Sequence, residues 1–425
     1  MGSYCTIYFD DIDVWAAKTV VPDEWCAMFQ ESDRLVRNSP DPEDEDSAVV
    51  YEAVREVVLA RLSLLGCTAP VARERLITWL EAQRATWDEY RSEEGGEWAE
   101  GQAEALRTLT PEIWYARVAQ VLATQYTEDE PFDEIDRLMR EEEDSPLWFD
   151  GYGSLLSLRA LLDACPDVRT VTLDISDLIG GGWLSEDERV CEARRKDSGL
   201  EPRPLAPTVI LAEGSSDIRV LQRSLPVLFP EWQDYFSFFN HDELEKKVDG
   251  GANYLVKFLT AFAAARAPFR VVAVFDNDTA GVQAYDQASA LGLPDNIIVV
   301  RLPDIGLARA YPTVGPQGHH IVDVNGKAAS IELYLGREAL MIDGELRPVR
   351  WKGYVQAADA YQGEVTGKSE VERAFLRALP TFSSPVEARA AFPELVSVWE
   401  EIYGVVERSA EMAQRKLHGR TRIEV

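Results

Sequence analysis

Two segments decide the fold of this chain: Thr208-Val-Ile-Leu-Ala-Glu-Gly-Ser-Ser-Asp217 and Val271-Val-Ala-Val-Phe-Asp-Asn-Asp-Thr-Ala-Gly281. Each begins with a short, largely β-branched run, stops at carboxylates and continues into a helical pattern. This pattern is typical of a buried parallel strand that delivers acidic side chains to the carboxyl edge of a sheet. Carboxylates gathered at one sheet edge predict a site for a metal ion.

Strand and helix patterns alternate around these two segments. We expect strands at 208–212, 235–239, 270–275 and 296–302, and helices at 216–228, 250–266 and 279–291. Such a series predicts an α/β domain with a mostly parallel sheet and helices on both faces. Beyond it we expect a loop at 303–330, a short element at 330–335, and helices at 368–378 and 393–418.

The preceding half of the chain has mainly helical patterns. Strands are expected at 4–9 and 168–175, and helices at 22–37, 47–65, 71–91, 110–125 and 153–164. The acidic segment 39–46 is expected to be a solvated loop, and Pro202, Pro204 and Pro207 predict a linker. We therefore predict an acidic, mainly α-helical domain at 1–200, an α/β domain at 208–380 and a helical extension at 381–425.

The net charge of −31 is concentrated in the first half of the chain. Residues 1–200 carry 44 acidic and 19 basic side chains, whereas residues 201–425 carry 30 and 24. The first half should therefore repel nucleic acid, while the second half can hold a local basic groove. Acidic blocks such as 93–100 and 128–144 are usually solvated faces; nucleic-acid mimicry and docking of a basic partner are the alternatives.

Composition also bounds the cellular context. The five cysteines are odd in number and include no Cys-x-x-Cys pair, which favours buried thiols over a disulfide framework or a zinc site. No run approaches the roughly 18 consecutive apolar residues that a membrane span needs. The N-terminus has no basic segment before its apolar residues. We expect a soluble, cytoplasmic protein.

The acidic residues of the two segments suit a hard cation. Asp276 and Asp278 are two apart just past a strand, so side-chain alternation puts both on the same side and lets them share one ion. Glu213 ends an earlier parallel strand and is expected to face them, and Gly214 permits close approach of a phosphate. Asp217 lies in the first turn of the next helix, where it either helps to bind the ion or caps the helix.

These residues carry a resemblance. Glu213-Gly-Ser-Ser-Asp217 followed by Asp276-Asn-Asp278-Thr-Ala-Gly281 resembles the Toprim domain, the metal-binding catalytic fold of topoisomerases, primases, OLD-family nucleases and some small RNA-maturation ribonucleases. It resembles the OLD type most, which implies an acidic residue and a lysine downstream. Glu332 and Lys368 match these two by position and context. The chain lacks Gly-x-x-x-x-Gly-Lys-Ser/Thr, so an ATP-driven enzyme of that type is not supported.

The resemblance implies a metal-dependent nuclease that hydrolyses phosphodiester bonds, with a role in anti-phage defence. The implied ligands of Mg²⁺ or Mn²⁺ are Glu213, Asp217, Asp276, Asp278 and Glu332. The ion would polarise the phosphate and activate a water, in a one-metal or a two-metal mechanism. Glu213 is alternatively a general base, and Lys368 would neutralise charge that develops on the phosphate.

The N-terminal half resembles, in order and composition, the helical domain that accompanies Toprim in bacterial conflict systems and is called HEPN/Toprim-associated. HEPN ribonucleases have an Arg followed four to six residues later by His. This chain has no histidine before His241. The resemblance therefore implies a sensing, docking or restraining role for the N-terminal half. It is not expected to be an active HEPN ribonuclease of the Arg–His type.

Two rival functions stay open. Phe275-Asp-Asn-Asp-Thr resembles the nucleophile motif of haloacid-dehalogenase-type phosphatases, although a βαβ series precedes it and no Gly-Asp-x-x-x-Asp segment follows. A non-catalytic binding or regulatory protein on a Toprim scaffold is the other alternative. An EF-hand loop from Asp276 is excluded because Gln287 stands where the bidentate glutamate is needed. His319 and His320 are either phosphate contacts or simply exposed.

The charge pattern and the resemblance together define the expected partners. These are nucleic acid, either DNA or RNA with tRNA among the candidates, and a basic protein or regulatory subunit at the acidic half. A homo-oligomer is also open, and no membrane contact is expected.

Overall fold

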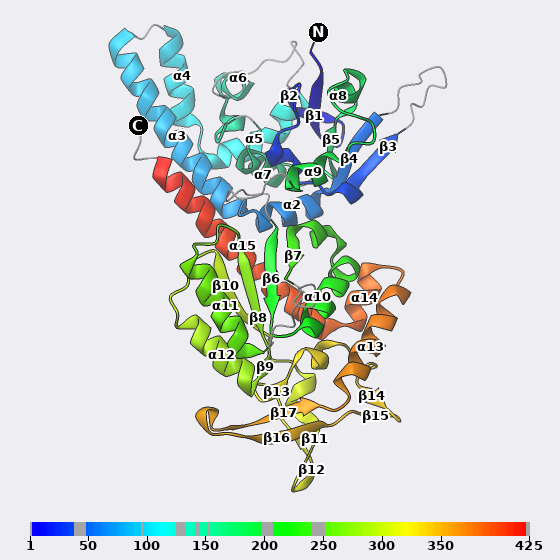
Figure 1. Cartoon of the computed structure of the whole chain (residues 1–425). Helices are drawn as coiled ribbons and strands as arrows, with labels where there is room; N and C mark the ends of the chain where they lie inside the picture. Colours follow the sequence, from blue (N-terminus) through cyan, green and yellow to red (C-terminus); the bar gives the residue numbers. More distant parts are fainter. Residues whose placement is uncertain are drawn as a thin grey trace. The chain divides into compact units, whose positions relative to one another are not determined.

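The computed structural model describes residues 2–37, 48–94, 97–124, 133–140, 145–151, 153–196, 207–239 and 251–421. The chain divides into two compact units. The first comprises Met1–Gly199, Arg203–Leu205 and Ala410–Val425, and the second comprises Leu200–Pro202 and Ala206–Ser409. Figure 1 traces both units. The last helix, α15 (Pro393–Thr421), supplies residues to each of them.

The first unit combines helices with an antiparallel sheet. The strand order is β2-β1-β5-β4-β3, with β1 at Tyr4–Phe9, β2 at Ile12–Lys18, β3 at Arg34–Arg37, β4 at Ala48–Val54 and β5 at Thr170–Asp174. The main helices are α2 (Arg55–Leu64), α3 (Ala69–Glu94), α4 (Glu97–Thr108), α5 (Pro111–Ala123), α6 (Glu134–Arg140) and α7 (Leu155–Ala164). The predicted helical N-terminal region is confirmed, with a sheet added to it.

Two predicted helices of this unit are wrong. In the segment 22–37 only α1 (Asp23–Cys26) is α-helical, and β3 follows a short 3-10 turn. Residues 25–30 are buried consecutively and not on one face, so they form no amphipathic helix. The predicted helix 47–65 begins as strand β4, because its β-branched residues pair with β3 and β5. Helix α2 then ends before Gly66, as predicted, with Gly66 at φ +83°.

Some predicted features lie outside the described residues. These are the acidic loop 39–46, most of the acidic block 128–144, and the linker at Pro202 and Pro204. The five cysteines are all described; each is buried and none forms a disulfide, as predicted. Among the helices that the structure describes, none combines the length and apolar character that a membrane crossing requires.

The second unit contains the predicted parallel sheet. Its strand order is β10-β8-β6-β7, and all neighbours are parallel: β6 (Thr208–Ala212), β7 (Phe236–Phe238), β8 (Val271–Phe275) and β10 (Ile297–Arg301). Every residue of β8 is buried. Helices α11 (Ala252–Ala264) and α12 (Thr279–Ser289) share one apolar cluster with β8. Helix α10 (Ser215–Leu228) is joined to α15 by the Trp399 indole, which donates to Ser224 Oγ at 3.0 Å.

The predicted loop at 303–330 is wrong for much of its length. It contains β11 (Tyr311–Gly315), β12 (Gly318–Val322) and β13 (Ala328–Ala329). The first two form a hairpin, because Gly318 adopts φ +100° at its turn. They join β16 (Val349–Val355) and β17 (Ala360–Val365) in a second sheet of order β12-β11-β16-β17. The remaining elements include η6 (Ile331–Tyr334), α13 (Lys368–Ala378) and α14 (Pro385–Ala391).

Candidate metal and catalytic site

Glu213 and Asp276 meet at the carboxyl edge of the parallel sheet. They follow the neighbouring strands β6 and β8, which pair with each other as far as Ala212 and Val274. The Asp276 amide donates to Glu213 Oε1 at 3.0 Å. The parallel pairing thus brings together two carboxylates that are far apart in the sequence, as the two segments predicted.

The two-residue strand β9 (Asn277–Asp278) continues from Asp276 and pairs with β13. Asn277 is fully buried; its amide donates to Asp304 Oδ1 at 2.8 Å, and its Oδ1 accepts from Gly326 N at 3.1 Å. Asp276 and Asp278, on either side of it, are only partly buried. This pattern is the one expected from alternation along an extended backbone.

Asp278 begins helix α12. Its Oδ1 accepts from Gly281 N at 2.8 Å, so it is an N-cap, and its Oδ2 accepts from Gln362 Nε2 at 2.6 Å. Gln362 Oε1 in turn accepts from Ala280 N at 3.0 Å. The sequence reasoning missed Gln362, because no motif surrounds it and it reaches the site from β17.

Gly281 is needed where α12 passes the sheet edge. A Cβ on this residue would lie 2.2 Å from the Asp276 carbonyl oxygen and 2.9 Å from Glu213 Oε1. No side chain fits at these distances. Packing at this edge therefore requires the glycine that stands three residues after the second aspartate of the Asp-x-Asp motif.

Asp217 is held at the start of α10. Its Oδ2 accepts from Gly214 N at 2.9 Å, and its Oδ1 accepts from Ser216 Oγ at 3.3 Å. These bonds make it a helix-capping residue. Asp217 caps the helix and also lies close enough to the other acids to affect them, because its charge raises the pKa of both Glu213 and Asp276.

Glu332 and Lys368 form an ion pair. Glu332 is 5% exposed in η6, and its Oε2 lies 3.1 Å from Lys368 Nζ. Ser330 Oγ donates to the same carboxylate oxygen at 2.6 Å and accepts from Lys368 Nζ at 3.1 Å. Ser330 thus bridges the pair, a role that the sequence reasoning did not assign. Next to it, Ile331 N donates to Asp276 Oδ1 at 3.2 Å, which joins η6 to the sheet edge.

The carboxylates perturb one another. Burial raises the pKa of Glu213 to about 7, and the charges of Asp278 and Asp217 add to this rise. Burial, followed by the charge of Glu332, also raises the pKa of Asp217 to about 7. The pKa of Asp276 lies well above its usual range, because burial and then four neighbouring carboxylates disfavour its charged form.

Lys368 is the cation among these acids. Burial lowers its pKa, but the carboxylates of Glu332 and Asp276 outweigh burial, and the net shift is upward. The structure therefore brings all six predicted residues into one electrostatic cluster, which we call the acidic edge: Glu213, Asp217, Asp276, Asp278, Glu332 and Lys368.

His319 and His320 are not part of the acidic edge. Both are exposed on β12, and their side chains have no polar contact with it within the described residues. Of the two interpretations left open for them, phosphate contact or simple exposure, the structure shows the exposure.

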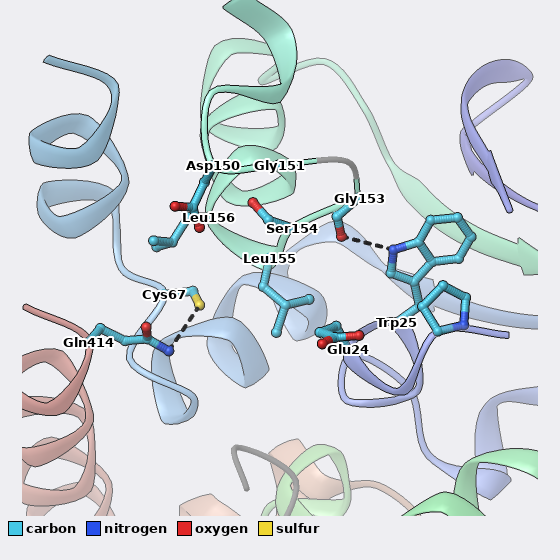
Figure 2. Close-up of a pocket in the computed structure, with 11 residues that line it drawn as sticks. Glu24, Trp25, Cys67, Asp150, Gly151, Gly153, Ser154, Leu155, Leu156 and Gln414 are labelled. Carbon is cyan, nitrogen blue, oxygen red and sulfur yellow. Dashed lines mark hydrogen bonds between the residues drawn. The ribbon is translucent and has the colours of Figure 1, made fainter. Parts of the chain in front are cut away.

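The first unit contains a cavity of about 360 Å³ (Figure 2). Its lining includes Trp25, Cys67, Asp150 and Gln414. Burial raises the pKa of the Cys67 thiol to about 12, so the thiolate needed for nucleophilic attack is scarce. Asp150 is paired with Arg75, whose Nε lies 2.5 Å from Oδ1. Neither Cys67 nor Asp150 is therefore a ready catalytic group.

The donor chemistry of the acidic edge fits a divalent cation. Within the described ranges, no group of three or more Asp, Glu, His or Cys side chains is placed so that it could hold a metal ion by itself. Mg²⁺ usually binds through one or two carboxylates and completes its shell with waters and substrate phosphates. Hydrogen bonds from the described residues occupy Glu213 Oε1 and Asp276 Oδ1, but none reaches Glu213 Oε2 or Asp276 Oδ2. These two oxygens are the ones that donors among the described residues leave open for an ion.

Comparison with known proteins supports the N-terminal part of the prediction. Residues 1–197 match the family model described as HEPN/Toprim N-terminal domain 1. No curated protein and no solved structure matches the chain significantly. The match ends before Glu213, so it supports the predicted HEPN/Toprim-associated domain and leaves the acidic edge to be judged on its chemistry.

Proposed function

We propose that the second unit is a metal-dependent nuclease of the OLD-type Toprim class, which hydrolyses phosphodiester bonds of DNA or RNA at the acidic edge. The observation that carries this proposal is the gathering of five carboxylates and one lysine at the carboxyl edge of a parallel sheet, a place where open α/β sheets bind ligands. The match of residues 1–197 to a domain named for HEPN and Toprim supports it. A cytoplasmic role in anti-phage defence is part of the same proposal.

Mutual repulsion among the carboxylates supports a bound cation. Burial, and then the charges of neighbouring carboxylates, raises the pKa of each of Glu213, Asp217 and Asp276, so keeping these groups charged has an electrostatic cost. A divalent cation would offset this cost. We propose Glu213 and Asp276 as the main ligands of Mg²⁺ or Mn²⁺, with Asp278, Asp217 and Glu332 beside them. When bound, the ion would polarise the phosphate and lower the pKa of a water.

The chain's own groups have further roles in this proposal. A Glu213 pKa of about 7 places its carboxyl near the pH where a general base is most effective, which keeps that alternative role for it. Lys368 remains charged between Glu332 and Asp276, and its ammonium is placed to neutralise charge on a phosphate. Gln362 positions Asp278 by its hydrogen bond.

The test is cleavage with matched variants. Wild-type protein is incubated with plasmid, single-stranded DNA and total tRNA, in Mg²⁺ and in Mn²⁺. We expect cutting of at least one substrate, and its loss in Glu213→Gln and Asp276→Asn. Glu338→Gln is the matched control, because Glu338 is an exposed carboxylate of the same unit outside the acidic edge.

Three outcomes would contradict the proposal. The wild type cuts none of the substrates, the two site variants cut as well as Glu338→Gln, or a small chromogenic phosphate monoester is hydrolysed in place of nucleic acid. The last result would favour the haloacid-dehalogenase-type alternative. If the wild type cuts none of the substrates but binds a basic protein partner, the non-catalytic alternative would be favoured.

We also propose that the acidic first unit restrains the nuclease or docks a basic regulatory partner. Residues 410–425 belong to this unit, so truncation at residue 200 would leave them without their packing partners. Neutralising the block 128–144 by Asp→Asn and Glu→Gln changes is a milder test. A restraining role predicts faster cutting in this variant, and an unchanged rate would contradict it.

A further inference from the structure

The hairpin of β16 and β17 carries an aromatic cluster of half-buried Trp351 with exposed Tyr354 and Tyr361, which we call the aromatic hairpin. Tyr354 is 51% exposed and Tyr361 is 57% exposed. They are directly opposite each other in the antiparallel register, so both point to the same face of the sheet. Their rings pack edge to face with centroids 5.2 Å apart, and the Trp351 ring lies 6.3 Å from that of Tyr361.

The aromatic hairpin is built as a fixed surface. A Cβ at Gly315 of β11 would lie 3.1 Å from Trp351 Cδ1, so the indole packs closely over this glycine. The Tyr354 hydroxyl donates to Asp359 Oδ1. Two large aromatic side chains exposed together on one ordered hairpin are costly in water, and such patches commonly mark a binding surface.

Strand β17 connects this surface to the acidic edge. Thr279 Oγ1 donates to the Tyr361 carbonyl at 3.0 Å, and the next residue, Gln362, donates to Asp278 Oδ2 at 2.6 Å. β17 also packs beside α12 and β13. Tyr361 is thus adjacent in sequence to a side chain that contacts a carboxylate of the acidic edge. Figure 1 shows β16 and β17 below β9 and β13.

We propose that the aromatic hairpin stacks the bases of unpaired nucleotides and so presents single-stranded nucleic acid to the acidic edge. This inference rests on the proposed function and names its substrate class. Bases in a duplex are stacked on each other, whereas unpaired bases offer their faces to aromatic side chains. Hairpin residues 349–365 carry two basic and two acidic side chains, and Lys352 is paired with Glu364. Stacking, not phosphate attraction, is therefore the recognition that this surface supplies.

The test measures binding without cleavage. Fluorescence anisotropy in EDTA compares full-length wild type with Tyr361→Ala and Tyr354→Ala, using an unstructured single-stranded RNA, the DNA of the same sequence, and its duplex. We expect tighter binding of the single strands than of the duplex. Each alanine change should weaken single-strand binding by about 5-fold to 100-fold, the range measured when one base loses its stacking partner. The RNA and DNA arms identify which strand is preferred.

Two controls separate stacking from other effects. Tyr361→Phe keeps the ring and should bind within about 2-fold of wild type, because stacking uses the π face and not the hydroxyl. Trp183→Ala removes an aromatic side chain of the first unit that is 58% exposed, and it should leave binding unchanged. The salt dependence of binding should have the same slope in Tyr361→Ala as in wild type, since no phosphate contact is removed.

Equal single-strand affinity in wild type and Tyr361→Ala would overturn the inference, as would equal affinity for duplex and single strand. A loss of self-association in Tyr354→Ala, measured by sedimentation, with unchanged nucleic-acid binding would instead make the hairpin a contact between copies of the chain. These results are independent of cutting. Cleavage that is insensitive to the hairpin variants would refute the inference alone, whereas single-strand binding without cleavage would refute the nuclease proposal alone.

Discussion

Replacement of Gly281 by alanine tests how the acidic edge is packed. The added Cβ would lie 2.2 Å from the Asp276 carbonyl oxygen and 2.9 Å from Glu213 Oε1. The first of these atoms belongs to the backbone directly after the fully buried strand β8, and it cannot turn away as a side chain would. The start of α12 must therefore move away from the strand.

The cost can be worked from three contributions. Overpacking of a dense site costs about 1–3 kcal/mol. Displacement of α12 also weakens the cap, in which Gly281 N donates to Asp278 Oδ1 at 2.8 Å, and losing such a cap costs about 0.5–2 kcal/mol. Alanine recovers about 1 kcal/mol of helix propensity relative to glycine. We expect a net destabilisation of about 2 kcal/mol.

Urea denaturation followed by circular dichroism measures this change. With a slope of about 2 kcal/mol per molar urea, the midpoint of the second unit should fall by about 1 M. The matched control is Gly306→Ala. Gly306 is exposed, has φ −61° and ψ −37°, and a Cβ there would meet nothing within 4 Å. The control should be neutral or more stable by about 0.4–1 kcal/mol. Equal midpoints for the two variants would refute the packing argument.

Three further outcomes follow from the electrostatics of the acidic edge. In EDTA, the free energy of unfolding should fall as pH rises from about 4.5 to 7, because the pKa of Glu213 is raised to about 7 on folding. Glu213→Gln should make the fall between pH 5 and pH 8, measured by urea titration at each pH, smaller by about 2 kcal/mol. Saturating Mg²⁺ should raise the melting temperature of the wild type by about 5–10 °C, whereas Asp276→Asn should melt no lower in EDTA and gain nothing from Mg²⁺. Lys368→Ala should lose about 1–3 kcal/mol, because Glu332 is 5% exposed and loses its cation, and Lys368→Ala with Glu332→Gln should recover most of this loss in a double-mutant cycle.

Parts of this arrangement could be predicted because their signals are local. A β-branched run that ends in Asp276-Asn-Asp278 fixes both the strand and the alternation that buries Asn277. Gln362 could not be found in this way, because it lies 84 residues from Asp278 and reaches it only through the pairing of β17. The strand at 48–54 was misread for a related reason. Its valines fit one face of a helix when the segment is taken alone, but pairing with β3 and β5 makes the segment a strand.

Four acids of the acidic edge form two pairs that differ in the hydrogen bonds their carboxylates accept. Asp217 accepts from Gly214 N and Asp278 accepts from Gly281 N, so each holds a helix start in place whether or not an ion is present. Glu213 and Asp276 each accept one backbone amide through one oxygen, and no described donor reaches the other oxygen. Amides that fix the ligands while leaving one oxygen of each open would preorganise a site for a cation. Burial and the neighbouring carboxylates raise the pKa of both Glu213 and Asp276, so keeping them charged is unfavourable when no cation offsets the charge. On the proposed function, the capping pair would position the edge and the open pair would bind the cation.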